Sequence, residues 1–160
     1  MVYYAQVMSP AGMLRLESDG ENLTGLYFMP EDAAAQYPYR ECPVFHSVRN
    51  WLDAYFRGDP YAPDFSMKLQ GTPFQMQVWE ILKTIPCGQV RTYGDIAREI
   101  AALAGMEKMS AQAVGQAVGR NPISIIVPCH RVVGAGGKLT GYAAGLEKKI
   151  WLLQHEGWLE

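Results

Sequence analysis

The sequence lacks a long apolar run. A helix needs roughly 20 consecutive apolar residues to cross a bilayer, and no stretch of this 160-residue chain approaches that length. The first twenty residues also lack the basic segment followed by an apolar one that marks a secretory signal. We therefore expect no membrane association and a cytoplasmic location. Hydrophobic residues make up 49% of the chain and charged residues 19%, a composition typical of a folded protein.

Cysteine is scarce, and a net positive charge is absent. Cys42, Cys87 and Cys129 are an odd number without CxxC spacing, which argues against a disulfide framework and a zinc knuckle. The net charge of −2 argues against a nucleic-acid ligand until the chain is divided. Residues 1–67 carry 4 basic and 9 acidic side chains, whereas residues 68–160 carry 10 and 7. The second half is therefore compatible with a polyanionic partner.

Residues 1–67 are predicted to form a small α/β domain. The β-rich runs YYAQVMS, GMLRLESDG and LTGLYFM are separated by turn residues and indicate an antiparallel sheet. The segment VFHSVRNWLDAYFRG predicts a helix that ends at Gly58. Its apolar residues at helical spacing are Val44, Val48, Trp51, Leu52 and Tyr55. A proline-rich stretch follows, so we expect a boundary near residue 67 and a second domain over residues 68–160.

The second domain is predicted to be mainly helical. Thr72, Thr92 and Ser110 are good N-caps for helices in FQMQVWEILKTI, YGDIAREIAALAG and AQAVGQAVGRN. The last two helices, joined by a compact turn, suggest a helix-turn-helix. Small residues occupy much of the final helix: Ala111, Ala113, Gly115, Ala117 and Gly119. Tight packing against another helix and close approach to a nucleic-acid backbone both explain this composition.

Cys129 is the candidate nucleophile. It follows the strand-like segment SIIVP and precedes a glycine-rich loop, whose backbone can approach a flat ligand closely. A thiol with a pKa of about 8.5 is mostly protonated at neutral pH and needs a base. His130 is adjacent, and Glu156 is a carboxylate able to orient it. A buried thiol beside a structural histidine fits the same residues. We expect His46 and His155 to be surface or packing residues.

The order of motifs from residue 70 to residue 158 resembles the O6-alkylguanine-DNA alkyltransferase family, in the form of its small bacterial members. The motifs are PCHRVVG, LTGYAAG and WLLQHEG, preceded by TPFQMQVWEILKTIPCGQVRTYGDIA and SAQAVGQAVGRNPISIIV. The resemblance implies a ribonuclease H-like α/β N-terminal domain and a mainly α, winged-helix-like C-terminal domain with a helix-turn-helix. It also implies transfer of an alkyl group from O6 of guanine in duplex DNA to the protein, after base flipping. O4 of thymine is a further candidate substrate.

The resemblance implies a role for each catalytic residue. Cys129 would accept the alkyl group and keep it as a thioether, so each molecule would act once. His130 would deprotonate Cys129 through a water molecule, and Glu156 would hold His130. Tyr93 would donate a proton or hydrogen bond to guanine N3. Asn121 would brace the turn that leads to the active-site strand.

Two further sets of residues follow from the resemblance. The pocket for the flipped base would be formed by Val132, Tyr142, Ala143, Ala144 and Lys149, with the amide of residue 143 reaching O6. The second helix of the helix-turn-helix would lie in the minor groove, and Ala117 would share in its close approach. The DNA-binding residues would be Thr92, Ser110, Ala111, Gln112, Ala113, Gly115, Gln116 and Arg120.

The chain departs from the family pattern at Gln112. Family members commonly have an arginine there, which fills the gap left by the flipped base, so Gln112 predicts weaker DNA affinity or slower flipping. We expect Lys108 to contact a phosphate and Arg131 to hold the loop after Cys129. The zinc ligands of some relatives are not recognisable, so we expect no metal, and no cofactor is implied.

The expected partner is double-stranded DNA containing O6-alkylguanine, bound by a monomer, with cooperative assembly on DNA left open. Two other functions compete with repair. A DNA-binding protein of this type can recognise alkylated bases without repairing them, and a Cys-His thiol hydrolase can act on acyl substrates over many turnovers. Replacing Cys129 by serine separates them, because only recognition without repair would survive that change.

Overall fold

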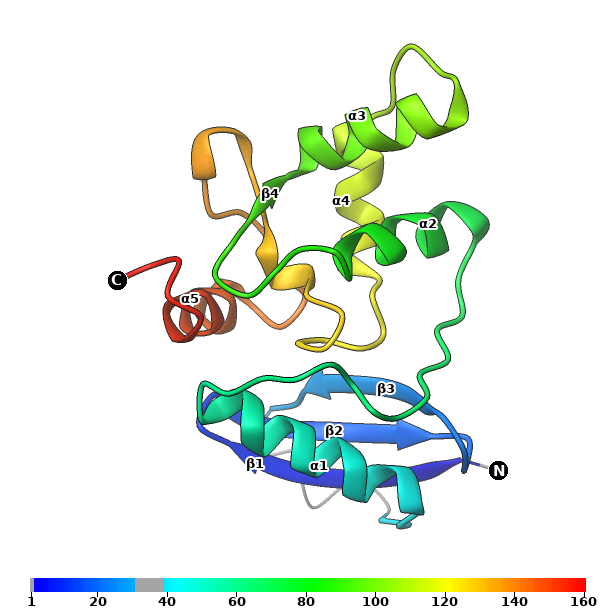
Figure 1. Ribbon diagram of the computed structural model, residues 1–160, viewed down its shortest axis with the longest axis vertical. Helices are drawn as coiled ribbons and strands as arrows, with labels where there is room; N and C mark the ends of the chain where they lie inside the picture. The colour runs from blue at the N-terminus through cyan, green and yellow to red at the C-terminus, as the bar shows by residue number, and fades with distance from the viewer. Residues whose placement is uncertain (1, 31–38) are drawn as a thin grey trace. The chain divides into compact units, whose positions relative to one another are not determined.

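The computed structural model describes residues 2–30 and 39–160, and these form two compact units (Figure 1). The first unit comprises the described residues up to Leu69 together with Pro122–Ser124. The second comprises Gln70–Asn121 and Ile125–Glu160. Among the described residues, no helix is both long enough and apolar enough to cross a membrane.

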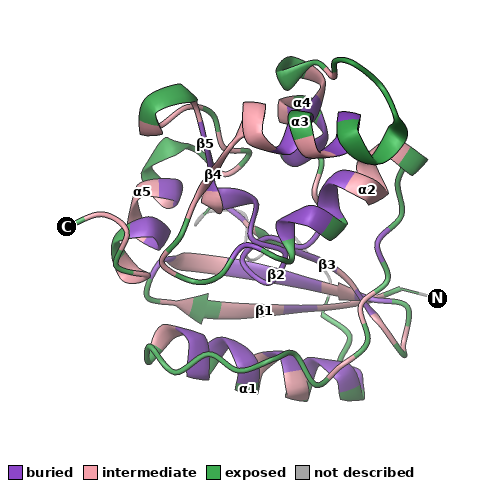
Figure 2. Ribbon diagram, turned by 45° about the horizontal axis from the view of Figure 1, so that its top comes forward, coloured by how far each residue is buried: buried purple, intermediate pink, exposed green. Residues whose placement is uncertain are grey.

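The first unit is the predicted antiparallel sheet with one helix along a face (Figure 1). Its strands are β1 (Tyr3–Ser9), β2 (Gly12–Ser18) and β3 (Leu23–Phe28), in that order across the sheet. The β1–β2 turn closes at Gly12, whose φ of 130° favours glycine. Helix α1 (Pro43–Phe56) buries every residue of its predicted apolar stripe, which Figure 2 shows in purple.

Two segments outside the sheet pair with β3. The Leu23 N–H donates to the carbonyl of Ser66 at 2.9 Å, and the Lys68 N–H donates to the carbonyl of Leu23 at 2.9 Å. Further along the strand, the Leu26 N–H donates to the carbonyl of Pro122 at 2.9 Å, and the Ser124 N–H donates to the carbonyl of Leu26 at 2.8 Å. These bonds satisfy backbone groups that an edge strand otherwise leaves open.

The second unit is mainly helical, as predicted. Its elements are α2 (Pro73–Leu82), β4 (Arg91–Thr92), α3 (Tyr93–Ala104), α4 (Ala111–Gly119), η2 (Cys129–Arg131), β5 (Val132–Val133), η3 (Ala135–Gly137) and α5 (Leu146–His155). The hydroxyls of Thr72, Thr92 and Ser110 cap α2, α3 and α4 by accepting from the backbone three residues on. Helices α3 and α4 pack on each other as the helix-turn-helix, and β4 pairs in parallel with β5.

Two local predictions were wrong. The helix expected to run to Ile85 ends at Leu82, and the Thr84 hydroxyl then donates to the carbonyl of Ile81 at 2.6 Å within a turn. The expected strand before Cys129 does not form, because Ile125 has a left-handed backbone (φ 69°) that an extended chain cannot contain. The short strand of this region, β5, follows Cys129 instead.

Candidate active site around Cys129

Cys129 opens the single turn η2 and is 5% exposed. The chain reaches it through the left-handed turn at Ile125, which is buried. Asn121, just beyond the end of α4, spans this turn by donating from Nδ2 to the carbonyl of Val127 at 2.8 Å. The Cys129 N–H donates to the same carbonyl at 2.8 Å. One carbonyl thus ties the end of the helix-turn-helix to the cysteine.

The groups around the Cys129 thiol have opposing effects on its pKa. Burial raises the pKa of Cys129, while hydrogen bonding from Asn121 and Tyr142 and the positive charge of Lys149 lower it. Burial dominates, so the pKa lies above its ordinary value. The thiol is therefore protonated at neutral pH, and a base must remove its proton before the sulfur can attack.

His130 is the residue that we expect to act as this base. Its Nε2 lies 2.7 Å from Oε2 of Glu156, and both side chains are fully buried. Burial lowers the pKa of His130 and outweighs the opposing effect of Glu156, so the imidazole is neutral. Because Nε2 donates to the carboxylate, Nδ1 is the acceptor nitrogen. Within residues 2–30 and 39–160, Nδ1 has no hydrogen-bond partner.

Glu156 also binds Arg131. The Arg131 Nε lies 2.7 Å from Oε1 of Glu156 and its Nη2 lies 2.9 Å from Oε2, while its Nη1 donates to the carbonyl of Ile85 at 2.6 Å. Burial raises the pKa of Glu156, but hydrogen bonds from His130 and Arg131 outweigh it and hold that pKa far below its ordinary value. We expected Arg131 to hold the loop after Cys129, and its fork on Glu156 was not predicted. The only signal of the fork in the sequence is that Arg131 directly follows His130.

Lys149 of α5 is a buried cation that gathers three carbonyls. Its Nζ donates to Val132 at 2.6 Å, Thr140 at 2.8 Å and Gly141 at 3.3 Å. Burial lowers the pKa of Lys149 to about 8. The glycine-rich loop is therefore fastened to β5 and to α5 by a single side chain, with the loop residue Tyr142 next in sequence to the bound Gly141 carbonyl.

Tyr93 lies where the loop and the helix-turn-helix meet. It is the first residue of α3, its ring centroid is 5.9 Å from Nζ of Lys149, and a Cβ on Gly115 of α4 would lie 3.6 Å from its ring. Burial raises the pKa of Tyr93, and a hydrogen bond with the Thr140 side chain lowers it. The phenol is therefore protonated at neutral pH and available as a donor.

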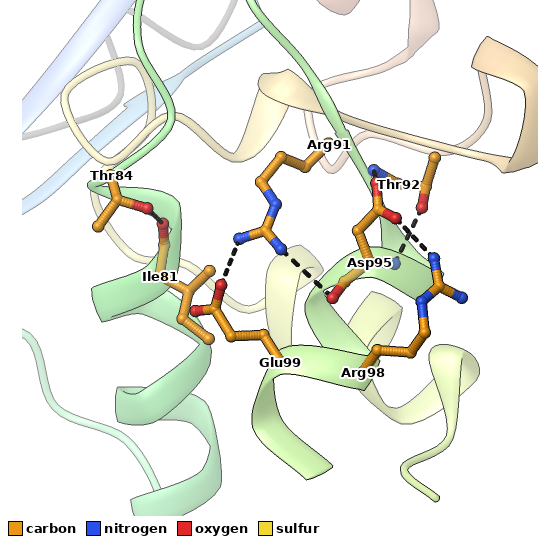
Figure 3. Close-up of polar contacts among 7 residues, drawn as sticks. All are labelled: Ile81, Thr84, Arg91, Thr92, Asp95, Arg98 and Glu99. Atoms are coloured by element: carbon orange, nitrogen blue, oxygen red, sulfur yellow. Dashed lines mark hydrogen bonds and ion pairs between the residues drawn. The ribbon is translucent and has the colours of Figure 1, made fainter. Parts of the chain in front are cut away.

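The start of α3 is held by a polar network (Figure 3), of which the sequence predicted only the Thr92 cap. Thr92 and Asp95 form a reciprocal capping box, with bonds of 2.9 and 3.0 Å. Arg98 binds Asp95 at 2.6 Å, and Arg91 of β4 binds Glu99 at 2.9 Å. These contacts fix the position from which Tyr93 extends.

The remaining expected pocket residues differ in exposure. Val132 is buried and Tyr142 is half-buried with its hydroxyl enclosed, whereas Ala143 is exposed and Ala144 half-buried. The two alanines therefore lie in the more open part of the loop. In the described parts of the chain, no group of three or more His, Cys, Asp or Glu residues is arranged to hold a metal ion.

Two family models match the chain. Residues 73–158 match the DNA-binding domain of 6-O-methylguanine DNA methyltransferase, and residues 2–69 match the ribonuclease-like domain of the same protein. The chain belongs to this family. It is 46% identical over 159 residues to the methylated-DNA–protein-cysteine methyltransferase of Methanosarcina acetivorans, covering 98% of this chain and 99% of that one.

Solved structures of the family match over nearly the whole chain. Mycobacterium tuberculosis O6-methylguanine methyltransferase is 43% identical, with a TM-score of 0.82 over 98% of this chain and 93% of that one. Mycobacterium tuberculosis OGT in complex with DNA is also 43% identical, with a TM-score of 0.82 over 96% and 92% of the two chains. The ribonuclease-like and DNA-binding domains of the family are thus the two parts of this fold.

Helix α4 presents most of the expected DNA-binding residues of this family member. Ser110, Ala111, Gln112, Gln116 and Arg120 are exposed, and Ala113 and Gly115 are half-buried. A groove of about 690 Å³ runs between this face and the start of α2, lined by Phe74, Gln75, Gln116 and Arg120 among others.

The placement of Ala117 corrects one expectation. Ala117 was expected to allow close approach to DNA, but it is buried between Val114 and Val118 on the inner side of α4. Its carbonyl accepts a hydrogen bond from Nε1 of Trp79 at 2.8 Å. Tight packing on α2 therefore explains the small residue at this position.

The other two histidines, His46 and His155, contact residues of their own helices. His46 is an exposed residue of α1, with its Nε2 3.4 Å from Asn50, and His155 stacks on Trp151 with ring centroids 5.2 Å apart. Of the other cysteines, Cys42 is buried at the start of α1 and Cys87 is exposed. Burial raises the pKa of Cys87, which makes it a poor nucleophile at neutral pH.

Proposed function

We propose that this protein repairs duplex DNA by moving the methyl group from O6 of guanine onto the sulfur of Cys129, once per molecule. The observation that carries the proposal is the His130–Glu156 pair directly after Cys129, in which a buried neutral imidazole has one nitrogen held by a carboxylate and the other available as a base. The family is that of proteins whose name states transfer from methylated DNA to a protein cysteine. Larger alkyl groups and O4 of thymine are further candidates.

The transfer is an in-line displacement at the methyl carbon. Nδ1 of His130 takes the Cys129 proton through a water molecule, and the imidazolium is stabilised by Glu156. The sulfur–carbon bond forms as the carbon–O6 bond breaks, and the bonding electrons pass to the guanine. Tyr93 donates to N3 and disperses the negative charge on the base. The product is a thioether, which leaves Cys129 without a thiol for a second transfer.

Lys149 and Asn121 support this chemistry. The charge of Lys149 lowers the pKa of the Cys129 thiol, and its three carbonyl contacts fasten the loop of Tyr142, Ala143 and Ala144 beside the sulfur. Asn121 fixes the turn that presents the cysteine. We assign the floor of the base pocket to Val132 and its outer wall to the loop, with the amide of Ala143 directed at O6.

The DNA surface in this proposal is the exposed side of α4 with Thr92 at the start of α3. Small residues at Ala111, Ala113 and Gly115 permit close approach of a minor groove, and Gln112 occupies the space of the flipped base. The second half of the chain carries the positive charge that DNA binding requires. Residues 68–160 thus hold both DNA binding and alkyl transfer, while residues 1–67 are structural, and the protein acts as a monomer.

The test is the stoichiometry of repair. A duplex with one O6-methylguanine is mixed with the protein at increasing excess of DNA, and restored guanine is counted. We expect one guanine per protein molecule, no restoration by Cys129→Ser, and an unchanged count for Cys87→Ser. Restoration beyond one equivalent would indicate a catalyst with turnover. Tight binding of the duplex with no restored guanine would indicate recognition without repair.

A further inference from the structure

We propose that Arg131 is a positioning residue of the methyl-transfer site, which holds the Glu156 carboxylate as a fixed, charged acceptor for His130 Nε2 and thereby leaves Nδ1 as the base. The inference rests on the proposed function, because it concerns the same site. It assigns to Arg131 a task in proton transfer, which differs from the expected task of holding the loop.

The Glu156 carboxylate binds two side chains at once, the guanidinium of Arg131 and the imidazole of His130. Arg131 contacts both oxygens of Glu156, at 2.7 and 2.9 Å, and His130 contacts Oε2 at 2.7 Å. Oε2 is thus shared between the imidazole and the guanidinium. The third nitrogen of Arg131 is bound to the Ile85 carbonyl at 2.6 Å. The guanidinium is therefore fixed at both ends, and it fixes the carboxylate in turn.

Burial makes this fork necessary. The Glu156 side chain is fully buried and that of Arg131 is 11% exposed. A buried carboxylate without compensating donors is protonated or moves to water. A protonated Glu156 accepts a hydrogen bond from Nε2 of His130 only weakly. The proton of the neutral imidazole is then no longer held on Nε2. With Arg131 in place, the carboxylate stays ionised and the tautomer that exposes Nδ1 is favoured.

The charges around His130 decide the direction of the effect. Glu156 raises the pKa of His130, while burial and the positive charges of Arg131 and Lys149 lower it. Cys129 precedes His130 in η2, and Cys87 lies beside Arg131 and Glu156. Removing the charge of Arg131 leaves Glu156 less neutralised. The His130–Glu156 pair then takes up a proton at higher pH than in the wild type.

The experiment compares Arg131→Met with the wild type by ¹⁵N NMR titration of the His130 ring and by the single-turnover rate of methyl transfer against pH. We expect the midpoint of His130 titration and the acid limb of the rate profile to move upward together, by about one to three pH units. Arg131→Lys keeps the charge but not the fork. It should titrate within about half a unit of the wild type and transfer methyl about tenfold more slowly.

The controls separate this role from general structural damage. Arg49 forms a similar fork on Glu41, at 2.6 and 2.7 Å, within the first unit. Arg49→Met should move neither the His130 titration nor the rate profile. If Arg131→Met slows transfer equally at every pH with His130 titrating as in the wild type, the proposal is wrong. If Arg131→Met does not fold, a wild-type rate in Arg131→Lys overturns the proposal and the expected loss of rate supports it.

The proposed function can fail separately. The titration of His130 needs no DNA, so a shifted midpoint in a protein that never becomes methylated would refute Cys129 as acceptor while leaving the Arg131–Glu156–His130 coupling intact. Methylation of a protein in which Arg131→Met leaves both the titration and the profile unmoved would refute the positioning role alone.

Discussion

Asn121 donates a hydrogen bond from Nδ2 to the carbonyl oxygen of Val127 at 2.8 Å, across the turn that holds Ile125 in a left-handed conformation. A β-branched residue in that conformation costs about 1–3 kcal/mol, which the surrounding contacts must offset. The hydrogen bond closes the turn, and the Cys129 N–H adds to it at the same carbonyl. The position of the thiol therefore depends on an amide eight residues earlier.

We expect Asn121→Ala to lower the free energy of unfolding by about 1–3 kcal/mol, because a buried carbonyl loses a donor. The single-turnover rate should fall as well, since the thiol is no longer held. Urea unfolding and rapid-quench assays measure the two effects. Asn50→Ala, at an exposed site of α1, is the matched control and should change neither. Wild-type stability and rate in Asn121→Ala would refute the bracing role.

Lys149→Met tests how the glycine-rich loop is fastened. Without the ammonium, three carbonyls lose their shared donor, and we expect faster amide hydrogen exchange in residues 134–145. The thiol also loses a positive charge that lowers its pKa, so transfer should slow. Lys138→Met, at an exposed position of the same loop, serves as control. Unchanged exchange in Lys149→Met would mean that the loop is held by other contacts.

Gln112→Arg tests the departure from the family pattern. The exposed side chain lies in the first turn of α4, where an arginine can reach a flipped-out site and its partner base. We expect tighter binding to duplex DNA by about tenfold, the equivalent of one charge-assisted hydrogen bond, and faster single-turnover repair. Gln89→Arg adds the same charge at an exposed site outside α4. An equal gain in DNA affinity from both variants would mean that the added charge, and not its position on α4, causes the effect.

The buried histidine makes stability depend on pH. The pKa of His130 in the folded protein lies below its ordinary value of 6.5. Below about pH 6.5, His130 therefore binds a proton in the unfolded chain but remains neutral in the folded protein. The free energy of unfolding falls as the pH falls. Glu156 has a lowered pKa, so its contribution is complete above its ordinary value of 4.5 and is lost only at more acidic pH.

We expect urea unfolding at pH 7, 6 and 5 to show this decline in the wild type and a flatter profile in His130→Gln. The exposed His46 is the matched control, and His46→Gln should keep the wild-type slope. A His130→Gln profile as steep as that of the wild type would assign the decline to other groups.

Local patterns predicted the sheet of the first unit and helices α1 to α4, but not helix α5 or the short strands β4 and β5. Thr72, Thr92 and Ser110 cap helices as expected, and the sheet of the first unit has the predicted strands, because capping and alternation are decided by neighbours within a few residues. The left-handed Ile125 was missed, because its conformation is stabilised by Asn121 and the buried surroundings rather than by its own preference.

Contacts between residues that are far apart in the sequence could be predicted only in part. Residue chemistry singled out Cys129, His130 and Glu156 as candidates, and the family resemblance then gave each a role. The 26 positions between His130 and Glu156 carry no periodicity that would link the two. The Arg131 fork was also missed, because Glu156 lies 25 positions away, and so were the three carbonyls of Lys149, which lie 8 to 17 positions away. Ala117 was misplaced because composition alone does not tell which face of a bare helix packs inward.

The most direct measurement is the intact mass of the protein, followed by peptide mapping, after mixing with a duplex that contains one O6-methylguanine. We expect a gain of one methyl group, located on Cys129 and equal in amount to the loss from DNA. An unchanged mass with guanine restored, or a methyl group on Cys87 or Cys42, would contradict Cys129 as the acceptor.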